Sequence, residues 1–320
     1  GTPMRTITAL FVGLGSIGTR HLKNLANLCA DRGWTLQADA LRSDLTRPLR
    51  PGAAELLHAQ YTDPAAAPAH YDMVFITNPT SLHAEALRQV KGRGEALFIE
   101  KPIFSAEQTG LALDELLPAG QKAYVAAPMR WCGAMLALKD RLPALHPYCA
   151  RVICSSYLPD WRPGVDYRTV YSARKALGGG VTTDLIHEWD YLVELFGVPE
   201  KLYNFKGTYS ELEIDSDDLS VYIAKYPTLL AEVHLDYFGR GYRRSIELFC
   251  RDGSYLADFG KGTLTLPDGT VQHYEEDVNR RYEREMEYFV DYALTGCGES
   301  CNPPALALKV LKLTLGENVQ

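Results

Sequence analysis

The stretch that decides the fold is TITALFVGLGSIGTRHLKNLANL, residues 6–28. Its first seven residues, 6–12, form a short and mostly apolar run of strand length. A glycine-rich turn follows in the pattern G-x-G-x-x-G, and apolar side chains then recur three or four residues apart, which predicts an amphipathic helix. This order of strand, glycine turn and helix is the context that a dinucleotide-binding fingerprint requires.

Each glycine of the turn has its own physical purpose. Gly13 permits the tight turn, Gly15 lets the backbone approach a diphosphate, and Gly18 lets the helix pack closely on the strand. We expect the diphosphate of NAD or NADP at the free N–H groups of Ser16-Ile17, where the positive end of the helix lies. A P-loop is rejected, because Thr19-Arg20 stands where that motif needs lysine followed by serine or threonine.

Composition and charge narrow the class of protein. The chain has 320 residues, a length that favours two domains, and its 46% apolar and 23% charged residues are typical of a globular protein. The net charge of −7 argues against nucleic acid or an anionic membrane as the main partner. No apolar run approaches the ~20 residues of a membrane span. We therefore expect a small-molecule partner.

Cysteine and histidine spacing points to neither cross-links nor metal. The seven cysteines are odd in number and scattered, so we expect free thiols rather than a disulfide framework. The first residues lack the basic and apolar regions of a signal peptide. Both features predict a cytoplasmic location. No H-x-x-x-H or C-x-x-C spacing is present, and we expect no metal site.

The second expected strand, Thr35–Leu41, bears on the choice between NAD and NADP. In a dinucleotide fold its end meets the adenosine ribose, where an acidic residue favours a free 2′-hydroxyl and an arginine favours a 2′-phosphate. Asp39 lies at the expected distance of about 20 residues after Gly18. The strand nevertheless runs on to Leu41, and Arg42-Ser43 follows it. Either cofactor fits this pattern, and we favour NADP.

Further along, strands and helices alternate. The expected elements are a helical or loop-like segment at Leu49–Tyr61, strands at Tyr71–Thr77, Ala96–Ile99 and Ala123–Ala127, and helices at Leu82–Val90 and Ala106–Leu117. This alternation predicts an open parallel sheet with helices on both faces. Ligands bind beyond the carboxyl ends of such strands, so the strand ends should converge. The residues assigned to the cofactor site are Gly13, Gly15, Ser16, Ile17, Gly18, Arg42, Ser43, Thr77, Asn78, Pro79, His83, Glu100, Lys101 and Arg130.

After about residue 145 the pattern becomes that of a largely antiparallel sheet. Alternating segments are predicted at 150–157, 201–208, 219–226, 229–237, 245–250, 254–258 and 263–266, with helices at 181–196, 282–294 and 305–315. The fold class is therefore α/β, with an N-terminal Rossmann dinucleotide-binding domain and a C-terminal α+β domain with an open sheet. We expect residues 1–130 to form the first domain and 131–320 the second, which binds substrate and forms oligomers. The last helix is a candidate to pack back on the first domain.

Three motifs in order give the chain a family resemblance. They are the glycine turn, Glu100-Lys101-Pro102 after a strand, and Gly178-Gly179-Gly180 followed by Asp184, His187 and Asp190. Together they resemble the Gfo/Idh/MocA family, the glucose–fructose oxidoreductase and inositol dehydrogenase group. The resemblance runs from about Thr6 to Leu315. It implies an enzyme of carbohydrate metabolism that uses NAD or NADP to oxidise or reduce a hydroxyl-bearing carbon of a sugar, sugar acid, nucleotide sugar or cyclitol.

The resemblance also implies roles for three residues. Lys101 matches the lysine that faces substrate and nicotinamide, and Pro102 matches a proline often found in cis. His187 matches the catalytic histidine, which would act as general base, or as acid in reduction, while Lys101 stabilises charge on the same oxygen. The two roles could be exchanged. Asp184 would orient His187 or bind a second hydroxyl, although an alignment anchored on the histidine puts Thr183 in the aspartate's place.

The segment 161–175 is the most suggestive for the substrate. It holds aromatic side chains, which suit sugar rings, and arginines, which suit carboxylate or phosphate. We expect an anionic or nucleotide-linked sugar; the alternative is a solvated basic loop or a subunit contact. The residues assigned to the substrate are Lys101, Trp161, Arg162, Arg168, Tyr171, Asp184 and His187.

Two other functions remain open at this point. One is a glycoside hydrolase or lyase that retains NAD and uses transient oxidation, and the other is a non-catalytic cofactor-binding sensor. Net turnover of the cofactor separates the first from a dehydrogenase. Because exposed sheet faces are usually covered, we also expect a homodimer or homotetramer.

Overall fold

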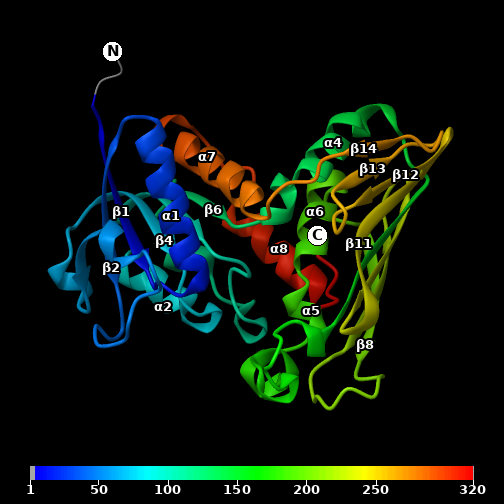
Figure 1. The fold of residues 1–320 in the computed structure, drawn as a ribbon, viewed down its shortest axis with the longest axis horizontal. Helices are drawn as coiled ribbons and strands as arrows, with labels where there is room; N and C mark the ends of the chain where they lie inside the picture. The colour runs from blue at the N-terminus through cyan, green and yellow to red at the C-terminus, as the bar shows by residue number, and fades with distance from the viewer. Residues whose placement is uncertain (1–3, 320) are drawn as a thin grey trace. The chain divides into compact units, whose positions relative to one another are not determined.

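A computed structural model describes residues 4–319, shown in Figure 1. Residues 1–3 and 320, the outer ends of the two expected domains, lie outside the described residues. The chain divides into two compact units: Gly1–Ala126 with Tyr282–Leu308, and Ala127–Arg281 with Lys309–Gln320. We expected residues 131–320 to form one domain. In the structure, Tyr282–Leu308 belongs to the first unit instead.

The first unit is built on a parallel sheet of six strands. They are β1 (Thr6–Val12), β2 (Thr35–Leu41), β3 (Leu57–Tyr61), β4 (Tyr71–Ile76), β5 (Gly94–Ile99) and β6 (Lys122–Val125). Their order is β3-β2-β1-β4-β5-β6, and all neighbours are parallel. The order reverses between β1 and β4, which is where a doubly wound sheet binds its ligand. This confirms the predicted Rossmann-like domain.

Two helices far apart in the sequence complete the core on one face of this sheet. They are α1 (Ser16–Asp31) and α7 (Asn279–Thr295), which Figure 1 draws in blue and orange. Leu22 and Leu25 of α1 share one buried cluster with Phe289 and Val290 of α7 and with the alternate side chains of the strands. The rings of Phe98 and Phe289 meet edge to face at 5.2 Å between centroids. The first unit is therefore closed by a helix that the chain adds late.

Two local predictions in the first unit are wrong. Residues 57–61 are not helical or loop-like but form β3, because they pair with the edge of β2, a partner that local sequence does not reveal. The helix expected over Ala106–Leu117 is reduced to a 3-10 turn, Ala106–Gln108, and the single turn α3 (Leu113–Leu116). Gly110 lies between them, and glycine in a helix interior is unfavourable by about 1 kcal/mol. On the other side of the sheet, α2 (His83–Gln89) is close to the prediction.

The second unit holds an eight-stranded sheet. Its strands are β7 (Cys149–Tyr157), β8 (Lys201–Gly207), β9 (Leu219–Lys225), β10 (Leu230–Asp236), β11 (Phe238–Cys250), β12 (Gly253–Asp258), β13 (Thr263–Thr265) and β14 (Val271–His273). The order is β14-β13-β12-β11-β7-β10-β9-β8, and only the β7–β10 pair is parallel within the described residues. The prediction of a largely antiparallel sheet is confirmed.

Helices cover one face of this second sheet. They are α4 (Gly133–Arg141), α5 (Val181–Asp184) and α6 (His187–Phe196), all drawn in green in Figure 1. Val152, Val233 and Ile246 are buried on the covered face, and Trp189 of α6 meets Tyr222 edge to face at 5.3 Å. The last helix, α8 (Pro304–Thr314), begins in the first unit and ends in the second.

The single helix predicted over Val181–Phe196 is wrong. The chain forms two helices, α5 and α6, that are separated at residues 185–186. The cause lies in tertiary contacts of the first turn: the Thr182 hydroxyl donates to Asp217 at 3.0 Å, and three hydroxyls hold the Asp184 carboxylate. The spacing of three residues predicts that Asp184 and His187 share one helix face. They do not, because Asp184 ends α5 and His187 begins α6.

Candidate active site

The glycine turn of the first unit forms a close-fitting cradle. Gly13 has φ +89°, and a Cβ added there would lie 2.7 Å from the Asn78 Cα. A Cβ at Gly18 would lie 2.7 Å from the Gly13 carbonyl oxygen, whereas one at Gly15 would meet nothing within 4 Å. Two glycines thus serve close packing and the middle one leaves open space, which is where a diphosphate must approach the backbone.

The start of α1 is suited to an anion. Gly15 caps this helix without a side-chain hydrogen bond, and the first turn carries no acidic residue. The Oδ1 atom of Asn78, in the next strand's turn, is buried and has no hydrogen-bond partner among residues 4–319. Free N–H groups, the helix dipole and an available acceptor beside the turn together fit a bound dinucleotide.

We expect Gly13→Ala to weaken dinucleotide binding by at least ~10-fold and to destabilise the fold by roughly 1–3 kcal/mol. The new methyl group would collide with the Asn78 backbone, and alanine tolerates this φ poorly. Thermal unfolding and NADP titration measure the two effects. Gly33→Ala is the matched control, because Gly33 has φ +72° but open space around it. Unchanged stability and affinity in Gly13→Ala would contradict the cradle.

His83 holds two loops of the first unit together. Its Nδ1 lies 2.9 Å from the Ile103 carbonyl oxygen and its Nε2 lies 3.1 Å from the Asn78 carbonyl oxygen. Burial lowers the pKa of the imidazole. The neutral ring has one N–H, so it donates to one carbonyl at a time. His83 was assigned to the cofactor, but its described contacts are with the backbone that carries Asn78-Pro79 and Pro102-Ile103.

The end of β2 separates the two candidates for the adenosine ribose. Asp39 is 4% exposed, and its carboxylate accepts a hydrogen bond of 2.7 Å from the Tyr71 hydroxyl and lies 3.3 Å from His58. Arg42 follows the strand, where its guanidinium donates to Gln60 at 3.0 Å and to the Arg47 carbonyl oxygen. The arginine, rather than the aspartate, therefore lies at the strand end.

A cavity of about 440 Å³ opens beside this arginine. Three arginines line it, together with apolar and small residues: Arg42, Leu45, Arg47, Leu49, Arg50, Pro51, Gly52, Ala54, Glu55 and Gln60. The exposed Ser43, the other residue assigned to the ribose, precedes the loop that forms one wall. The cavity has the charge and size to take a phosphorylated ribose.

The Glu100-Lys101-Pro102 motif follows β5. Residues 12, 76 and 99 are in register on β1, β4 and β5, so Gly13, Thr77 and Glu100 follow at one level. The Thr77 hydroxyl donates to the Gly13 carbonyl oxygen at 2.6 Å. The peptide bond between Lys101 and Pro102 is cis. The Lys101 ammonium makes no hydrogen bond or ion pair within residues 4–319, so it is available to a ligand.

Glu100 fixes the backbone of this lysine. One carboxylate oxygen accepts the Lys101 backbone N–H at 2.9 Å, and the other lies 2.7 Å from the Nε2 of His21 on α1. Burial acts to raise the pKa of Glu100, but the hydrogen bond from His21 and the charge of Lys101 outweigh it and hold the pKa below its ordinary value of 4.5. His21 is a contact that sequence reasoning missed; the only signal was a histidine three residues after Gly18.

The lowered pKa of Glu100 predicts a specific acid sensitivity. A carboxyl whose pKa is lower in the folded chain contributes stability above its unfolded pKa and loses it as the pH falls through the folded value. We expect Glu100→Gln to lower stability by about 1.5–3 kcal/mol at neutral pH, with the gap to wild type narrowing below about pH 4.5. Thermal unfolding from neutral pH to about pH 3.5 measures it. Glu85→Gln, at an exposed carboxyl, is the control; a constant gap would contradict the prediction.

In the second unit, Asp184 lies in a cluster of hydroxyls. Its Oδ1 accepts the Tyr171 hydroxyl at 2.8 Å, and its Oδ2 accepts the Ser172 hydroxyl at 2.6 Å and the Tyr237 hydroxyl. Its partners among residues 4–319 are these hydroxyls and not His187. Burial and the Asp184 charge raise the pKa of both tyrosines, Tyr171 and Tyr237, so they remain donors. Asp184, the last residue of α5, thus connects the loop before the glycine run to Tyr237, which lies between β10 and β11.

His187 is the first residue of α6 and is half-buried. The break after α5 places it at the start of a separate helix. Glu188, the next residue, is fully buried and bound by Arg244, whose Nε lies 2.8 Å from it. This buried pair fixes the first turn of α6 to β11.

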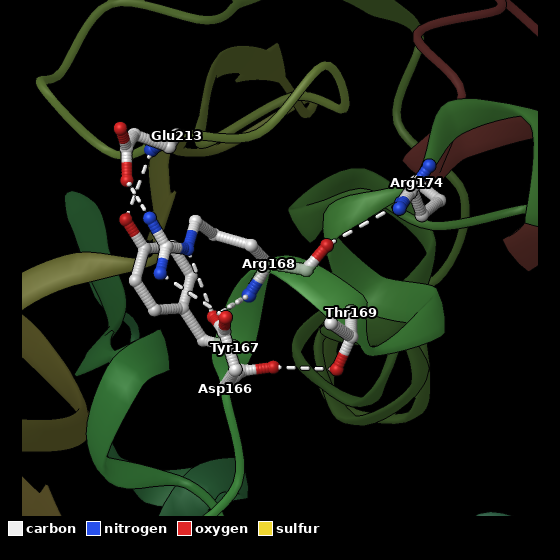
Figure 2. Close-up of polar contacts among 6 residues, drawn as sticks. All are labelled: Asp166, Tyr167, Arg168, Thr169, Arg174 and Glu213. Atoms are coloured by element: carbon white, nitrogen blue, oxygen red, sulfur yellow. Dashed lines mark hydrogen bonds and ion pairs between the residues drawn. The ribbon is translucent and has the colours of Figure 1, made fainter.

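The basic segment 161–175 is less cationic than its sequence suggests. Figure 2 shows the Arg168 guanidinium bound by Asp166 at 2.9 Å and by Glu213 at 2.7 Å. Arg174 donates to the Arg168 carbonyl oxygen at 3.3 Å, and the Tyr167 hydroxyl accepts the Glu213 backbone N–H. Arg168, which was assigned to the substrate, therefore links this loop to the segment around Glu213. Its positive charge is compensated by Asp166 and Glu213.

A small cavity of about 50 Å³ remains in the same segment. It is lined mostly by aromatic and apolar side chains: Leu158, Pro159, Trp161, Arg162, Val165, Tyr167, Val170, Tyr171 and Ser172. Trp161 donates from its indole N–H to Ser156 at 3.0 Å and meets Tyr237 edge to face. Arg162 has no ion pair or hydrogen bond within the described residues, so its charge is the one available to a ligand among the arginines assigned to the substrate.

Arg130, assigned to the cofactor, belongs to the second unit. Its guanidinium is 2% exposed and lies 3.6 Å from Asp190 and 3.9 Å from Glu194, both on α6. The structure thus places it with a buried carboxylate pair, whereas the glycine turn, Thr77, Asn78 and Glu100 gather in the first unit.

Among residues 4–319, no helix is long and apolar enough to cross a membrane, and no group of three or more metal-binding side chains is found.

Comparison with known proteins agrees with this geometry. Residues 7–126 match the model of the Gfo/Idh/MocA oxidoreductase family, described as having an NAD-binding Rossmann fold. A comparison with curated proteins found no match. The fold is shared with myo-inositol 2-dehydrogenase from Lactobacillus plantarum, at 20% identity and a TM-score of 0.74 over 97% of this chain and 96% of that one.

Two further solved structures share the fold at similarly low identity. UDP-N-acetylglucosamine 3-dehydrogenase from Acidithiobacillus ferrooxidans aligns at 20% identity and a TM-score of 0.70, covering 98% of this chain and 96% of that one. Levoglucosan dehydrogenase in complex with NADH aligns at 15% identity and a TM-score of 0.78, covering 97% and 95%.

A Rossmann unit with an intact glycine cradle and a second unit with an open, largely antiparallel sheet make up the fold that the chain shares with these dehydrogenases. Residues 7–126, which hold the parallel sheet and the glycine cradle, match the Gfo/Idh/MocA oxidoreductase family model, and this part of the chain resembles an NAD-binding domain of that family.

Proposed function

We propose that the protein transfers hydride between NADP and a hydroxyl-bearing carbon of an anionic sugar derivative, such as a sugar acid or nucleotide sugar. The observation that carries this proposal is Lys101. Its backbone is held by Glu100 at the level of the glycine turn, and its ammonium has no partner within residues 4–319. A fixed backbone with a free charged tip is what a residue that stabilises a reacting oxygen requires.

The nicotinamide of NADP, when bound, would accept hydride in oxidation and donate it in reduction. The residues of the chain position the substrate and transfer the proton. The ammonium of Lys101 donates a hydrogen bond to the substrate oxygen and stabilises the negative charge that develops on it. His187 takes the hydroxyl proton in oxidation and returns it in reduction, since imidazole titrates near neutral pH. Asp184 does not contact the reacting atoms in this proposal. It accepts hydrogen bonds from Tyr171 and Ser172 and so holds the loop that would receive the sugar.

Arg42 supports NADP over NAD. Asp39 is buried and committed to Tyr71, so it offers nothing to a ribose hydroxyl, whereas Arg42 lies at the strand end beside a cavity with two more arginines. A 2′-phosphate would find charge compensation there.

Arg162 supports an anionic substrate. Its guanidinium forms no ion pair within the described residues, and it lines the aromatic cavity with Trp161 and Tyr171. An aromatic face can pack on a sugar ring while a guanidinium binds carboxylate or phosphate.

The test is a substrate panel followed by the absorbance of the reduced nicotinamide. It compares NAD with NADP, and neutral sugars with sugar acids and nucleotide sugars. We expect net cofactor turnover with NADP and an anionic sugar. Product formation without net redox would favour a hydrolase or lyase that retains its cofactor, and a clear preference for neutral sugars would remove the anionic substrate.

We further propose a homodimer or homotetramer through the open face of the second sheet. Tyr203, Phe205 and Ile223 on β8 and β9 are 57%, 77% and 53% exposed, and Tyr203 is paired directly with Ile223. A contiguous apolar sheet face favours a second copy as its cover. Light scattering after gel filtration measures the mass. Phe205→Glu should yield monomers, and a monomeric wild type would exclude the assembly.

A further inference from the structure

We infer that His21 is a positioning residue for Lys101: through Glu100, it fixes the backbone of the lysine to the helix that begins at the cofactor cradle. The inference rests on the proposed role of Lys101. His21 lies on α1, and its Nε2 is 2.7 Å from one oxygen of Glu100, whose other oxygen accepts the Lys101 backbone N–H at 2.9 Å. His21 is 0% exposed and Glu100 is 7% exposed.

The direction of the proton follows from the state of the carboxyl. The pKa of Glu100 is held low, so the group is ionised and can only accept hydrogen bonds. His21 must therefore donate from Nε2, which makes the contact a charge-assisted hydrogen bond. The groups that face Glu100 are His21 from α1, Lys101 from its own loop and His83 from α2, whose own pKa is influenced by the Glu100 charge.

A purely packing role explains His21 poorly. Its ring lies against Phe98 at 4.7 Å and Tyr282 at 6.1 Å, both edge to face, in a setting that an apolar side chain could fill. Instead the chain places an imidazole there whose Nδ1 is buried without a hydrogen-bond partner in the described part of the chain. An unpartnered buried nitrogen is unfavourable. The hydrogen bond from His21 to Glu100 offsets this cost, and its consequence is that Glu100 holds the backbone of Lys101 in place.

This connection has a kinetic consequence. The same helix presents its first turn to the cofactor diphosphate and its second turn to Glu100, so one rigid element sets both the cofactor and the lysine. Breaking the bond should misplace the ammonium without removing the cradle. A shift of about 1 Å in a reacting group costs on the order of 10²-fold in rate. The loss should therefore appear in kcat and not in KM for NADP.

The experiment compares His21→Leu with His21→Gln in the full-length protein. Glutamine can place an N–H where Nε2 lies, whereas leucine cannot. With the most active sugar of the panel, we expect His21→Leu to lose about 10²-fold in kcat with KM for NADP within ~3-fold, and His21→Gln to stay within ~10-fold of wild type. The acid limb of the kcat profile should move to higher pH in His21→Leu, because Glu100 loses its donor.

A second readout needs no substrate and covers poor folding of the leucine variant. After reductive methylation with carbon-13, the dimethyl-lysine signal of Lys101, assigned with Lys101→Met, should shift in His21→Asn, whose amide is too short, and little in His21→Gln. His273→Leu is the matched control, because His273 forms a similar pair of 2.8 Å with Glu275 on the surface of the second unit.

Three outcomes decide the question. Loss of kcat in His21→Leu with rescue by glutamine supports the positioning role. An unchanged kcat and pH profile in His21→Leu, even with a lower Tm, would overturn it, as would equal Lys101 signals in His21→Gln and His21→Asn. The variant Lys101→Met distinguishes failure of the positioning role from failure of the proposed function. If Lys101→Met keeps normal turnover, the proposed role of Lys101 is wrong. If Lys101→Met loses turnover and His21→Leu does not, only the positioning role of His21 is wrong.

Discussion

Lys101→Met should lower kcat by about 10³-fold while the affinity for NADP changes by less than ~3-fold. Methionine preserves most of the stem, and Glu100 still holds the backbone through the N–H of residue 101. What disappears is the ammonium, which forms no hydrogen bond or ion pair within residues 4–319, although its charge helps to lower the pKa of Glu100. The effect should fall on the reacting oxygen, and single-turnover kinetics with titration of NADP measure the two parts.

His187→Asn is the companion to this measurement. Its amide keeps a hydrogen-bonding group at the start of α6 but cannot take a proton, so we expect a loss of about 10²–10⁴-fold in kcat. Lys91→Met serves as control, because the Lys91 ammonium is exposed and bound to the Glu115 carbonyl oxygen. Near-normal turnover in both Lys101→Met and His187→Asn, with cofactor bound, would remove the proposed chemistry.

Arg42→Ala should raise KM for NADP by about 10–100-fold and leave KM for NAD nearly unchanged. The guanidinium at the end of β2 is oriented by Gln60 and by the Arg47 carbonyl oxygen, and hydrogen bonds to a charged group contribute about 1.5–3 kcal/mol. Only NADP carries the phosphate that would receive this bond. The ratio of kcat/KM for the two cofactors is the measurement.

The matched control is Arg88→Ala, which removes an exposed arginine from α2 in the same unit without touching the cavity. It should change neither ratio nor rate. An equal loss for NAD and NADP in Arg42→Ala would mean that Arg42 only supports the loop. A wild-type preference for NAD would contradict the proposal that Arg42 selects the cofactor.

The sequence predicts most of the first unit because its signals are local. The glycine turn, the apolar strands and the helices between them are each visible in a short window, and the strand boundaries of β1 and β2 agree with the structure. The prediction fails where a partner is remote. Residues 57–61 become a strand because β2 is beside them, and 181–196 breaks because hydroxyls from residues 171, 172 and 237 hold Asp184.

The candidate site is predictable to the same degree. The motif residues Lys101, Asn78 and Gly13 follow from strand ends, which pattern reasoning finds. The compensation of Arg168 by Asp166 and Glu213 does not follow, because the glutamate lies 45 positions further along the chain. His21 was missed for a similar reason: its significance depends on Glu100, which lies 79 positions away.

The late arrival of α7 has a consequence for biosynthesis. Its Phe289 and Val290 belong to the same buried cluster as the glycine-turn helix, yet the ribosome produces them only after the entire second sheet. A nascent chain that ends near residue 126 would expose the apolar face of the parallel sheet that α7 later covers. Most of the second unit, Ala127–Arg281, is thus inserted between the two parts of the first, and the cofactor domain can be completed only after α7 has been translated.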